Sequence, residues 1–214
     1  MSLPELQRLL TGFYDLGCLP PVQDFVCDAD VARAAGASVV LRGEVLLILE
    51  EPEWVSVGLY VDPAALLALE AAGGLADALH EQENWSAFCL ITEGVSHFLY
   101  LMFRMRSDDP VSQLELEVQA EVDKYATALL VGNGVGAIRA RSREVRRRIF
   151  DDVRYLDAPE SEQGARYRIA TKIAWRYTGE LERRFLDRGE LEGFWRELRR
   201  FYRRGGHAKL MPLG

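Results

Sequence analysis

The chain has 214 residues, of which 49% are apolar and 28% charged, and its formal net charge is −7. This balance excludes an intrinsically disordered chain and suits one compact domain, or one domain with a helical extension. No apolar run reaches the ~18 residues of a membrane span, and the first residues lack the apolar core of a signal peptide. We therefore expect a protein that does not enter a membrane.

Cysteine and arginine usage indicates the compartment and the source. Cys18, Cys27 and Cys89 are odd in number and have no paired spacing, which favours buried thiols in a reducing environment. The basic residues are 23 Arg and 3 Lys. This bias is typical of a GC-rich genome, so we expect a protein of the bacterial cytoplasm.

The N-terminal part of the chain predicts two short helices. Four apolar residues between positions 6 and 13 share one helical face, and Pro20-Pro21 follow them as a stop. A second helix is expected from Asp28, a good N-cap residue, to Ala35, before Gly36.

Residues 38–61 predict a small antiparallel sheet. Three runs rich in β-branched, aromatic and other apolar residues, at 38–41, 44–49 and 54–61, are separated by connections short enough for hairpins. The middle run is apolar on both faces, which predicts a central strand covered on two sides. A three-stranded sheet of this kind needs helices to cover it.

The rest of the chain predicts helices. Asp62-Pro63 and Asp109-Pro110 each combine an N-cap residue with a proline suited to the first helical turn. The glycines of the segment 132–136 indicate a flexible joint after a helix; their spacing does not match a dinucleotide-binding loop. We expect helices at 63–72, 84–105, 111–131, 137–153, 162–186 and 190–203, and an irregular segment at 205–214.

Charge is distributed unevenly along the chain. Residues 1–138 contain 6 basic and 21 acidic side chains, whereas residues 139–214 contain 20 basic and 12 acidic ones. Such halves either attract each other in the fold or direct the basic half toward an acidic partner. We predict an α+β fold with an acidic domain over 1–131, comprising the sheet at about 38–61 and the helix pair at about 84–131. A basic helical region, 137–214, is expected to pack on this domain.

The helix pair predicts a candidate metal site. Glu93 and His97 are four residues apart on one helix, and Glu117 and Glu121 are four apart on the next. Because the connection between the helices is short, they are expected to run antiparallel, with His97 level with Glu117 and Glu93 level with Glu121. Three carboxylates and an imidazole suit a hard or borderline divalent metal.

The helical wheel supports a simpler interpretation of the same residues. Glu93, His97 and Arg104 lie nearly opposite the apolar stripe of their helix. On this interpretation the four candidate ligands form a solvated face, or a seam of ion pairs with Arg104, and the protein has no cofactor.

Arginines on two C-terminal helices form a candidate partner surface. Some of them are interleaved with aromatic residues, a composition also found on nucleic-acid-binding surfaces. Pairing with acidic helices of the same fold or with another protein is the preferred explanation, because the whole chain is acidic. The candidate residues are Arg139, Arg143, Arg146, Arg147, Arg148, Arg199, Arg200 and Arg203.

These patterns predict a non-catalytic interaction or regulatory protein that binds another protein or a second copy of itself. The first alternative is a metal-dependent, hydrolytic enzyme with its Glu/His site between the helices at 84–105 and 111–131. The second is a nucleic-acid binder that uses the arginine-rich helices.

Overall fold

The structure is a computed structural model that describes residues 2–36, 43–51, 53–73, 77, 79, 82–131, 138–153, 155 and 157–211. Most of these residues are helical, and the described strands form one two-stranded antiparallel sheet, so the α+β class is supported. The third strand expected at 38–41 and the glycine segment 132–136 lie outside the described residues.

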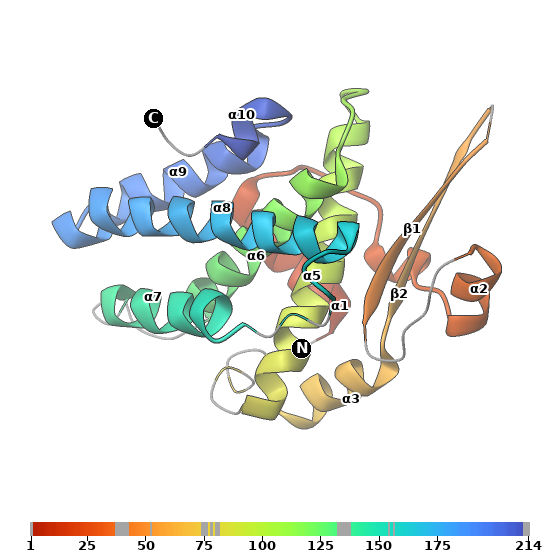
Figure 1. Cartoon of the computed structure of the whole chain (residues 1–214), viewed down its shortest axis with the longest axis horizontal. Helices are drawn as coiled ribbons and strands as arrows, with labels where there is room; N and C mark the ends of the chain where they lie inside the picture. Colours follow the sequence, from red (N-terminus) through yellow and green to blue (C-terminus); the bar gives the residue numbers. More distant parts are fainter. Residues whose placement is uncertain are drawn as a thin grey trace. The chain divides into compact units, whose positions relative to one another are not determined.

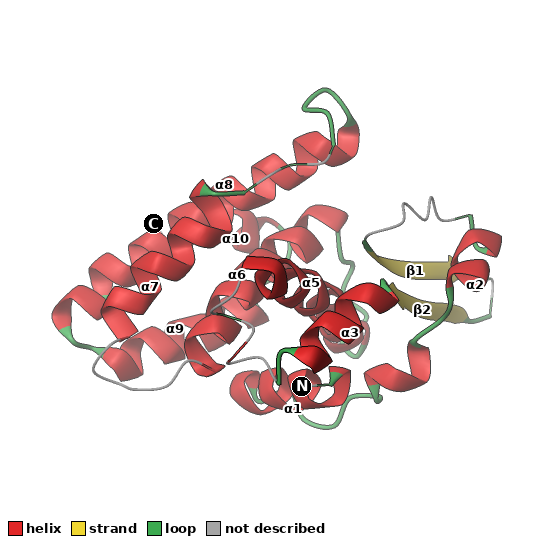
Figure 2. Cartoon of the chain, turned by 90° about the horizontal axis from the view of Figure 1, so that it is seen from below, coloured by secondary structure: helices red, strands yellow, loops and turns green. Residues whose placement is uncertain are grey.

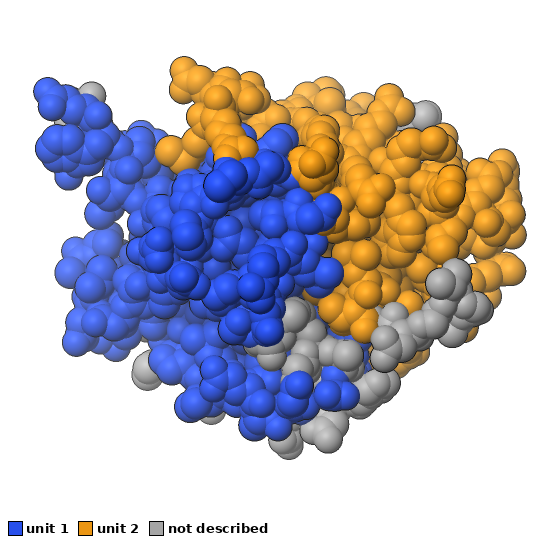
Figure 3. Space-filling view, turned by 180° about the vertical axis from the view of Figure 1, so that it is seen from behind, with its two compact units in different colours: residues 1–12, 16–103 blue, residues 13–15, 104–214 orange. Residues whose placement is uncertain are grey.

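The chain divides into two compact units, coloured separately in Figure 3. Unit 1 comprises residues 1–12 and 16–103, and unit 2 comprises residues 13–15 and 104–214. The predicted boundary between an acidic domain and a basic region falls near 131–137, where residues 132–137 are outside the described part. That boundary, and the packing of the basic region on the acidic domain, stay predictions.

Unit 1 begins with short helices whose ends follow the predicted caps. The Asp28 carboxylate accepts hydrogen bonds from the amides of Asp30 and Val31, which begins α2. The Asp62 carboxylate accepts one from Ala64 at the start of α3, with proline at the first helical position. The helices of this part are α1 (Leu3–Tyr14, its last two residues in unit 2), η1 (Val22–Phe25), α2 (Ala29–Ala34) and α3 (Pro63–Ala71).

The sheet of unit 1 is a hairpin of β1 (Glu44–Glu50) and β2 (Val55–Val61), which pair from Glu44 opposite Val61 to Glu50 opposite Val55. α2 lies beside the hairpin (Figure 1), and Cys27 donates its amide to the carbonyl of Leu59. Leu59 is fully buried, whereas Ile48 is 41% exposed.

The far part of β1 therefore corrects the expectation of a strand covered on two sides. The covering elements reach only the base of the hairpin, and its far end extends away from the other elements of unit 1 (Figure 1). Cys18 is exposed and Cys27 half-buried, so the expectation of buried thiols is wrong for Cys18.

Helix α5 (Gln82–Met105) is the longest element. By length and composition alone, its residues Asn84–Met105 could cross a membrane, but 67% of the most apolar window is buried within the structure. This burial is consistent with a core helix of a soluble protein. Phe98 packs against Phe25 within unit 1, with ring centroids 4.9 Å apart.

Unit 2 is built around α6 (Gln113–Val131), which is buried over residues 115–129, including its polar side chains. The helix begins at Gln113, close to the expected start at 111. Ser112 and Glu115 form a capping box there: each side chain accepts a hydrogen bond from the other residue's amide. α8 packs along α6 (Figure 2), and α10 occupies part of the segment expected to be irregular. The remaining elements are α7 (Ile138–Arg146), the π-helical turn η3 (Arg147–Asp151), α8 (Glu162–Arg184), η4 (Leu186–Arg188), α9 (Leu191–Arg203) and α10 (His207–Leu210).

A buried polar network joins distant parts of unit 2. The Lys209 ammonium is fully buried and donates hydrogen bonds to the Gln119 side chain at 2.6 Å and to the carbonyl of Phe201 at 3.1 Å. Gln119 and the Tyr14 hydroxyl both donate to one oxygen of Asp123, at 2.7 and 2.6 Å. Burial lowers the pKa of Lys209 well below its usual value, although the negative charge of Asp123 opposes this effect.

Candidate functional site

Three possible metal ligands of unit 1 meet at the base of the hairpin. Glu44 is the first residue of β1, and Glu93 and His97 lie one turn apart on α5. One ligand atom from each of the three residues lies within 4.8 Å of the other two. Nδ1 of His97 is 3.1 Å from Oε1 of Glu44, which is hydrogen-bonding distance.

The backbone of α5 allows this approach because Gly94 has no side chain. A Cβ atom at position 94 would lie 3.3 Å from Oε2 of Glu44 and 3.3 Å from Cδ1 of Leu59. Glu44 shares a face of the hairpin with Leu46 and Leu59, and strand alternation directs this face toward α5. A larger residue at position 94 would therefore move the carboxylate away from the helix.

The cluster is buried, which makes its charge costly. The side chains of Glu44 and His97 are only 7% and 6% exposed, and the Glu93 residue is half-buried. Unit 1 has 14 acidic residues and only three basic ones, Arg8, Arg33 and Arg42. Two carboxylates close together in such surroundings favour a bound cation or proton.

The structure buries three of the four predicted ligands and leaves Glu93 half-buried. His97, Glu117 and Glu121 are 5%, 7% and 7% exposed, so the alternative of a solvated face is wrong for them. In unit 2, Glu117 lies 3.6 Å from Nε of Arg166, and Glu121 accepts a hydrogen bond from Lys124 at 2.9 Å. The meeting of this pair with Glu93 and His97 stays a prediction.

Sequence reasoning found Glu93 and His97 but missed Glu44. Their four-residue spacing on one helix marks a shared face, whereas Glu44 is 49 positions before Glu93 and approaches only through tertiary folding. The available signal was an acidic residue on the same strand face as Leu46 and Ile48.

Arg104, which was expected to form an ion-pair seam with the candidate ligands, lies in unit 2. Its Nη2 atom is 3.3 Å from Oδ2 of Asp109.

Most of the predicted partner-binding arginines make contacts within unit 2. Those near the N-terminal end of α7 pair with Asp187: Arg139 at 2.7 Å and Arg143 at 3.3 Å. On α9, Arg200 lies 3.8 Å from Glu197. Arg147 pairs with Glu144 and Asp152. Arg199 and Arg203 donate hydrogen bonds to backbone carbonyls, Arg199 to that of Phe13 and Arg203 to those of Tyr14 and Asp15. Arg148 is half-buried.

Arg146 connects α7 to α8. It donates to Glu182 at 2.7 Å, to the hydroxyl of Thr178 at 3.1 Å and to the carbonyl of Trp175 at 3.0 Å. A Cβ atom at Gly179 would lie 2.8 Å from Nη2 of Arg146, so the glycine makes room for the guanidinium. These contacts identify Arg146 as a structural residue.

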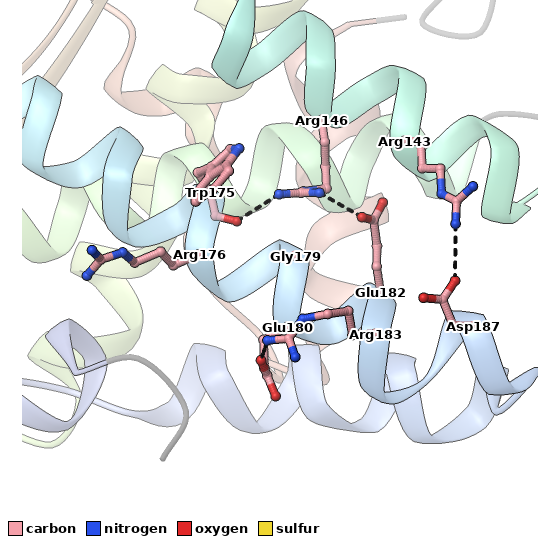
Figure 4. Close-up of a pocket in the computed structure, with 9 residues that line it drawn as sticks. All are labelled: Arg143, Arg146, Trp175, Arg176, Gly179, Glu180, Glu182, Arg183 and Asp187. Atoms are coloured by element: carbon pink, nitrogen blue, oxygen red, sulfur yellow. Dashed lines mark hydrogen bonds and ion pairs between the residues drawn. The ribbon is translucent and has the colours of Figure 1, made fainter.

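A hollow of about 440 Å³ lies between α7 and α8 (Figure 4). Its walls carry four arginines and three carboxylates, and Trp175 is 46% exposed. Among the described residues, Arg176 makes no hydrogen bond or ion pair with any other, in contrast to Arg143, Arg146 and Arg183. We call this region the arginine hollow; it is lined by Arg143, Arg146, Trp175, Arg176, Gly179, Glu180, Glu182, Arg183 and Asp187.

Comparisons with known proteins do not assign either region. No family model, no curated protein and no solved structure matches this chain.

Proposed function

We propose that this protein binds a divalent metal ion through Glu44, Glu93 and His97. The observation that supports the proposal is the approach of their ligand atoms to within 4.8 Å of one another. Two of these residues share a helical face, and the third arrives from a strand that is distant in the sequence. A metal ion would join β1 to α5 and would offset the negative charge of two nearby carboxylates.

The ligand types favour particular metals. Carboxylate oxygens suit Mn²⁺ and Mg²⁺, while an imidazole nitrogen favours Zn²⁺, Fe²⁺ and related ions. A mixed set of two carboxylates and one imidazole therefore suits a borderline transition metal such as Zn²⁺ or Mn²⁺. Glu117 and Glu121 are the proposed additional ligands, since the sequence predicts that they face the same helix.

Glu44, Glu93 and His97 alone would give three protein ligands, the number typical of catalytic rather than structural metal ions, because a coordination position is then left for water or substrate. Such an ion supplies Lewis acidity and lowers the pKa of a bound water. We therefore propose metal-dependent hydrolysis as the activity to test. The residue proposed as ligand or general base is Glu117, as its position in the predicted helix pair suggests.

Metal titration tests the proposal directly. Protein dialysed against EDTA is titrated with Co²⁺, Zn²⁺ and Mn²⁺ and followed by calorimetry and, for Co²⁺, by visible absorption. We expect about one equivalent to bind the parent protein, and a loss of affinity of ~10-fold or more in Glu44→Gln, Glu93→Gln and His97→Gln, as expected when a ligand is removed. Glu70→Gln is the matched control, because Glu70 is an exposed carboxylate on α3.

Thermal unfolding provides a second measurement. A metal that binds only the folded state stabilises it by about 2.7 kcal/mol at a free concentration of 100 times its Kd. Saturating metal should therefore raise the melting temperature of the parent and of Glu70→Gln by more than that of His97→Gln, whose affinity is lower. Glu117→Gln and Glu121→Gln should behave like His97→Gln if the larger ligand set is correct. The proposal would be contradicted if neither EDTA nor added metal changed the melting temperature and no visible absorption of bound Co²⁺ appeared.

Hydrolysis is tested separately from binding. Chromogenic nitrophenyl esters and phosphates are incubated with the metal-loaded and the EDTA-treated protein. The proposed chemistry requires turnover that depends on metal and is lost in Glu93→Gln. Metal binding without turnover would support a structural or regulatory site and would exclude hydrolysis of these substrate classes.

An interaction protein is the second candidate function, and a specific observation favours it. The far end of the hairpin exposes large apolar side chains, which a purely enzymatic role does not require. A role in protein binding is compatible with the metal site at the other end of the same hairpin.

A further inference from the structure

The far end of the β1–β2 hairpin combines apolar and acidic side chains. Ile48, Leu49, Trp54 and Val55 are each more than 40% exposed, and Trp54 is 57% exposed. The charged residues of this region are all acidic and exposed: Glu50, Glu51 and Glu53. We call these seven residues the hairpin tip; it extends from unit 1 as a narrow ribbon (Figure 1).

The outer surface of α8 has the complementary composition. It exposes two large apolar side chains, Ile169 at 49% and Trp175 at 46%. Lys172, Arg176 and Arg183 are exposed along the same helix, and Trp175, Arg176 and Arg183 line the arginine hollow.

In Figure 4 Trp175 and Arg176 lie at one end of the arginine hollow, and Arg143 lies at the other. The hollow thus has one more arginine than it has carboxylates, together with an exposed aromatic ring. Arg176 makes no hydrogen bond or ion pair within the described part of the chain, so its charge is available to a partner.

We propose that the hairpin tip of one copy of this chain docks on the arginine hollow of a second copy. The tip supplies the acidic and apolar groups, and the hollow supplies the cations and Trp175 as an apolar platform. Exchange of two tips between two copies would give a closed dimer, because both contacts would be identical. The interface is argued from these two surfaces and does not depend on metal binding.

Charge complementarity favours a second copy over a membrane. Exposed tryptophan and leucine residues also suit a lipid interface, but Glu50, Glu51 and Glu53 would be repelled by anionic lipid headgroups. The opposite net charges of the two units, −11 for unit 1 and +4 for unit 2, favour contacts between unit 1 of one copy and unit 2 of another.

Sedimentation equilibrium of the full chain tests the proposal. We expect concentration-dependent dimers at 50 mM salt that weaken at 500 mM salt, because exposed charge pairs are screened. Trp54→Ser should weaken association at least ~10-fold, as expected for an aromatic residue at the centre of an interface. Leu67→Ser is the matched control: Leu67 is a 65% exposed apolar residue on α3, outside both surfaces, and its replacement should leave association unchanged.

Charge exchange identifies the two surfaces as partners. The double variant Glu51→Lys/Glu53→Lys and the double variant Arg176→Glu/Arg183→Glu should each lose self-association. An equimolar mixture of the two should associate again, because the reversed tip then faces a reversed hollow. Asp24→Lys/Glu70→Lys changes the net charge as much as the tip variant, on exposed residues elsewhere in unit 1, and should associate like the parent.

Two results would overturn the proposal. The first is that the parent protein stays monomeric at ~100 µM in 50 mM salt. This holds even if the hairpin tip then binds another protein or lipid vesicles, because the proposed partner is a second copy. The second is a mixture of the two charge-reversed variants that fails to associate while each keeps the parent's melting temperature.

Discussion

Lys209→Met is the perturbation whose effect on stability the structure defines best. The substitution keeps most of the side-chain volume but removes the ammonium group that donates hydrogen bonds to Gln119 and to the carbonyl of Phe201. These acceptors would remain buried, and each buried acceptor left without a donor costs about 1–3 kcal/mol. We expect a loss of about 2–6 kcal/mol in the free energy of unfolding, because two buried acceptors lose their donor.

The assay is urea unfolding of the parent and the variant near pH 7, with Lys172→Met as the matched control. Lys172 is exposed on α8, so its replacement should change stability by less than about 0.5 kcal/mol. Equal unfolding midpoints for the parent and Lys209→Met would refute the interpretation that the ammonium supports the core of unit 2.

The pH dependence gives a second test of the same lysine. Because its pKa is lowered in the folded state, the unfolded chain binds more protons at every pH between the lowered value and the usual value of about 10.4. The parent should therefore gain stability relative to Lys209→Met as the pH rises toward 9.5, by at most about 1.4 kcal/mol per pH unit. Parallel pH curves would show that Lys209 keeps its proton in the fold throughout this range.

Three further predictions concern the hairpin, a capping box and a helix cap. Leu59→Ala should cost about 2–5 kcal/mol in urea unfolding because Leu59 is fully buried, whereas Ile48→Ala should cost less than about 1 kcal/mol; similar losses would contradict the exposed hairpin tip. Burial would raise the pKa of Glu115, but hydrogen bonds from Ser112 and Gly206 lower it overall, so Glu115→Gln should lose about 1–2 kcal/mol at pH 6. That difference should shrink as the pH falls through the lowered pKa of Glu115, where the parent carboxylate becomes protonated; a pH-independent difference would exclude this role. Asp28→Ala should cost about 1 kcal/mol by removing the cap of α2, and an unchanged unfolding midpoint would mean that the cap does not contribute.

Local signals predicted most of the helices and both described strands. The caps at Asp28 and Asp62 form as expected because each depends on residues two or three positions away. The start of α6 was predicted slightly early because two local signals compete there. Asp109-Pro110 resembles a cap, but the capping box of Ser112 and Glu115 lies nearer to the helical residues.

Burial was the property that sequence reasoning predicted least well. The helical wheel placed His97 opposite the apolar stripe of its helix, yet this residue is buried because the base of the hairpin covers that face. Conversely, the apolar residues Ile48 and Leu49 indicated a covered strand, yet both are exposed. A helical wheel describes one helix in isolation, whereas burial depends on elements from distant parts of the chain that pack against it.

The contacts of residues 13–15 with α9 have a consequence for folding. Arg203 donates a hydrogen bond to the carbonyl of Tyr14, 189 residues earlier in the chain, and the Tyr14 ring stacks on Tyr202. Closing a loop of that length costs about 2 kcal/mol more chain entropy than closing one of 20 residues. Local helices such as α8 should therefore form early during refolding, and the environment of Tyr14 should become native late. Unit 2 also cannot be isolated by a single cut in the chain. A fragment that begins at residue 104 lacks residues 13–15, whose carbonyls accept hydrogen bonds from Arg199 and Arg203.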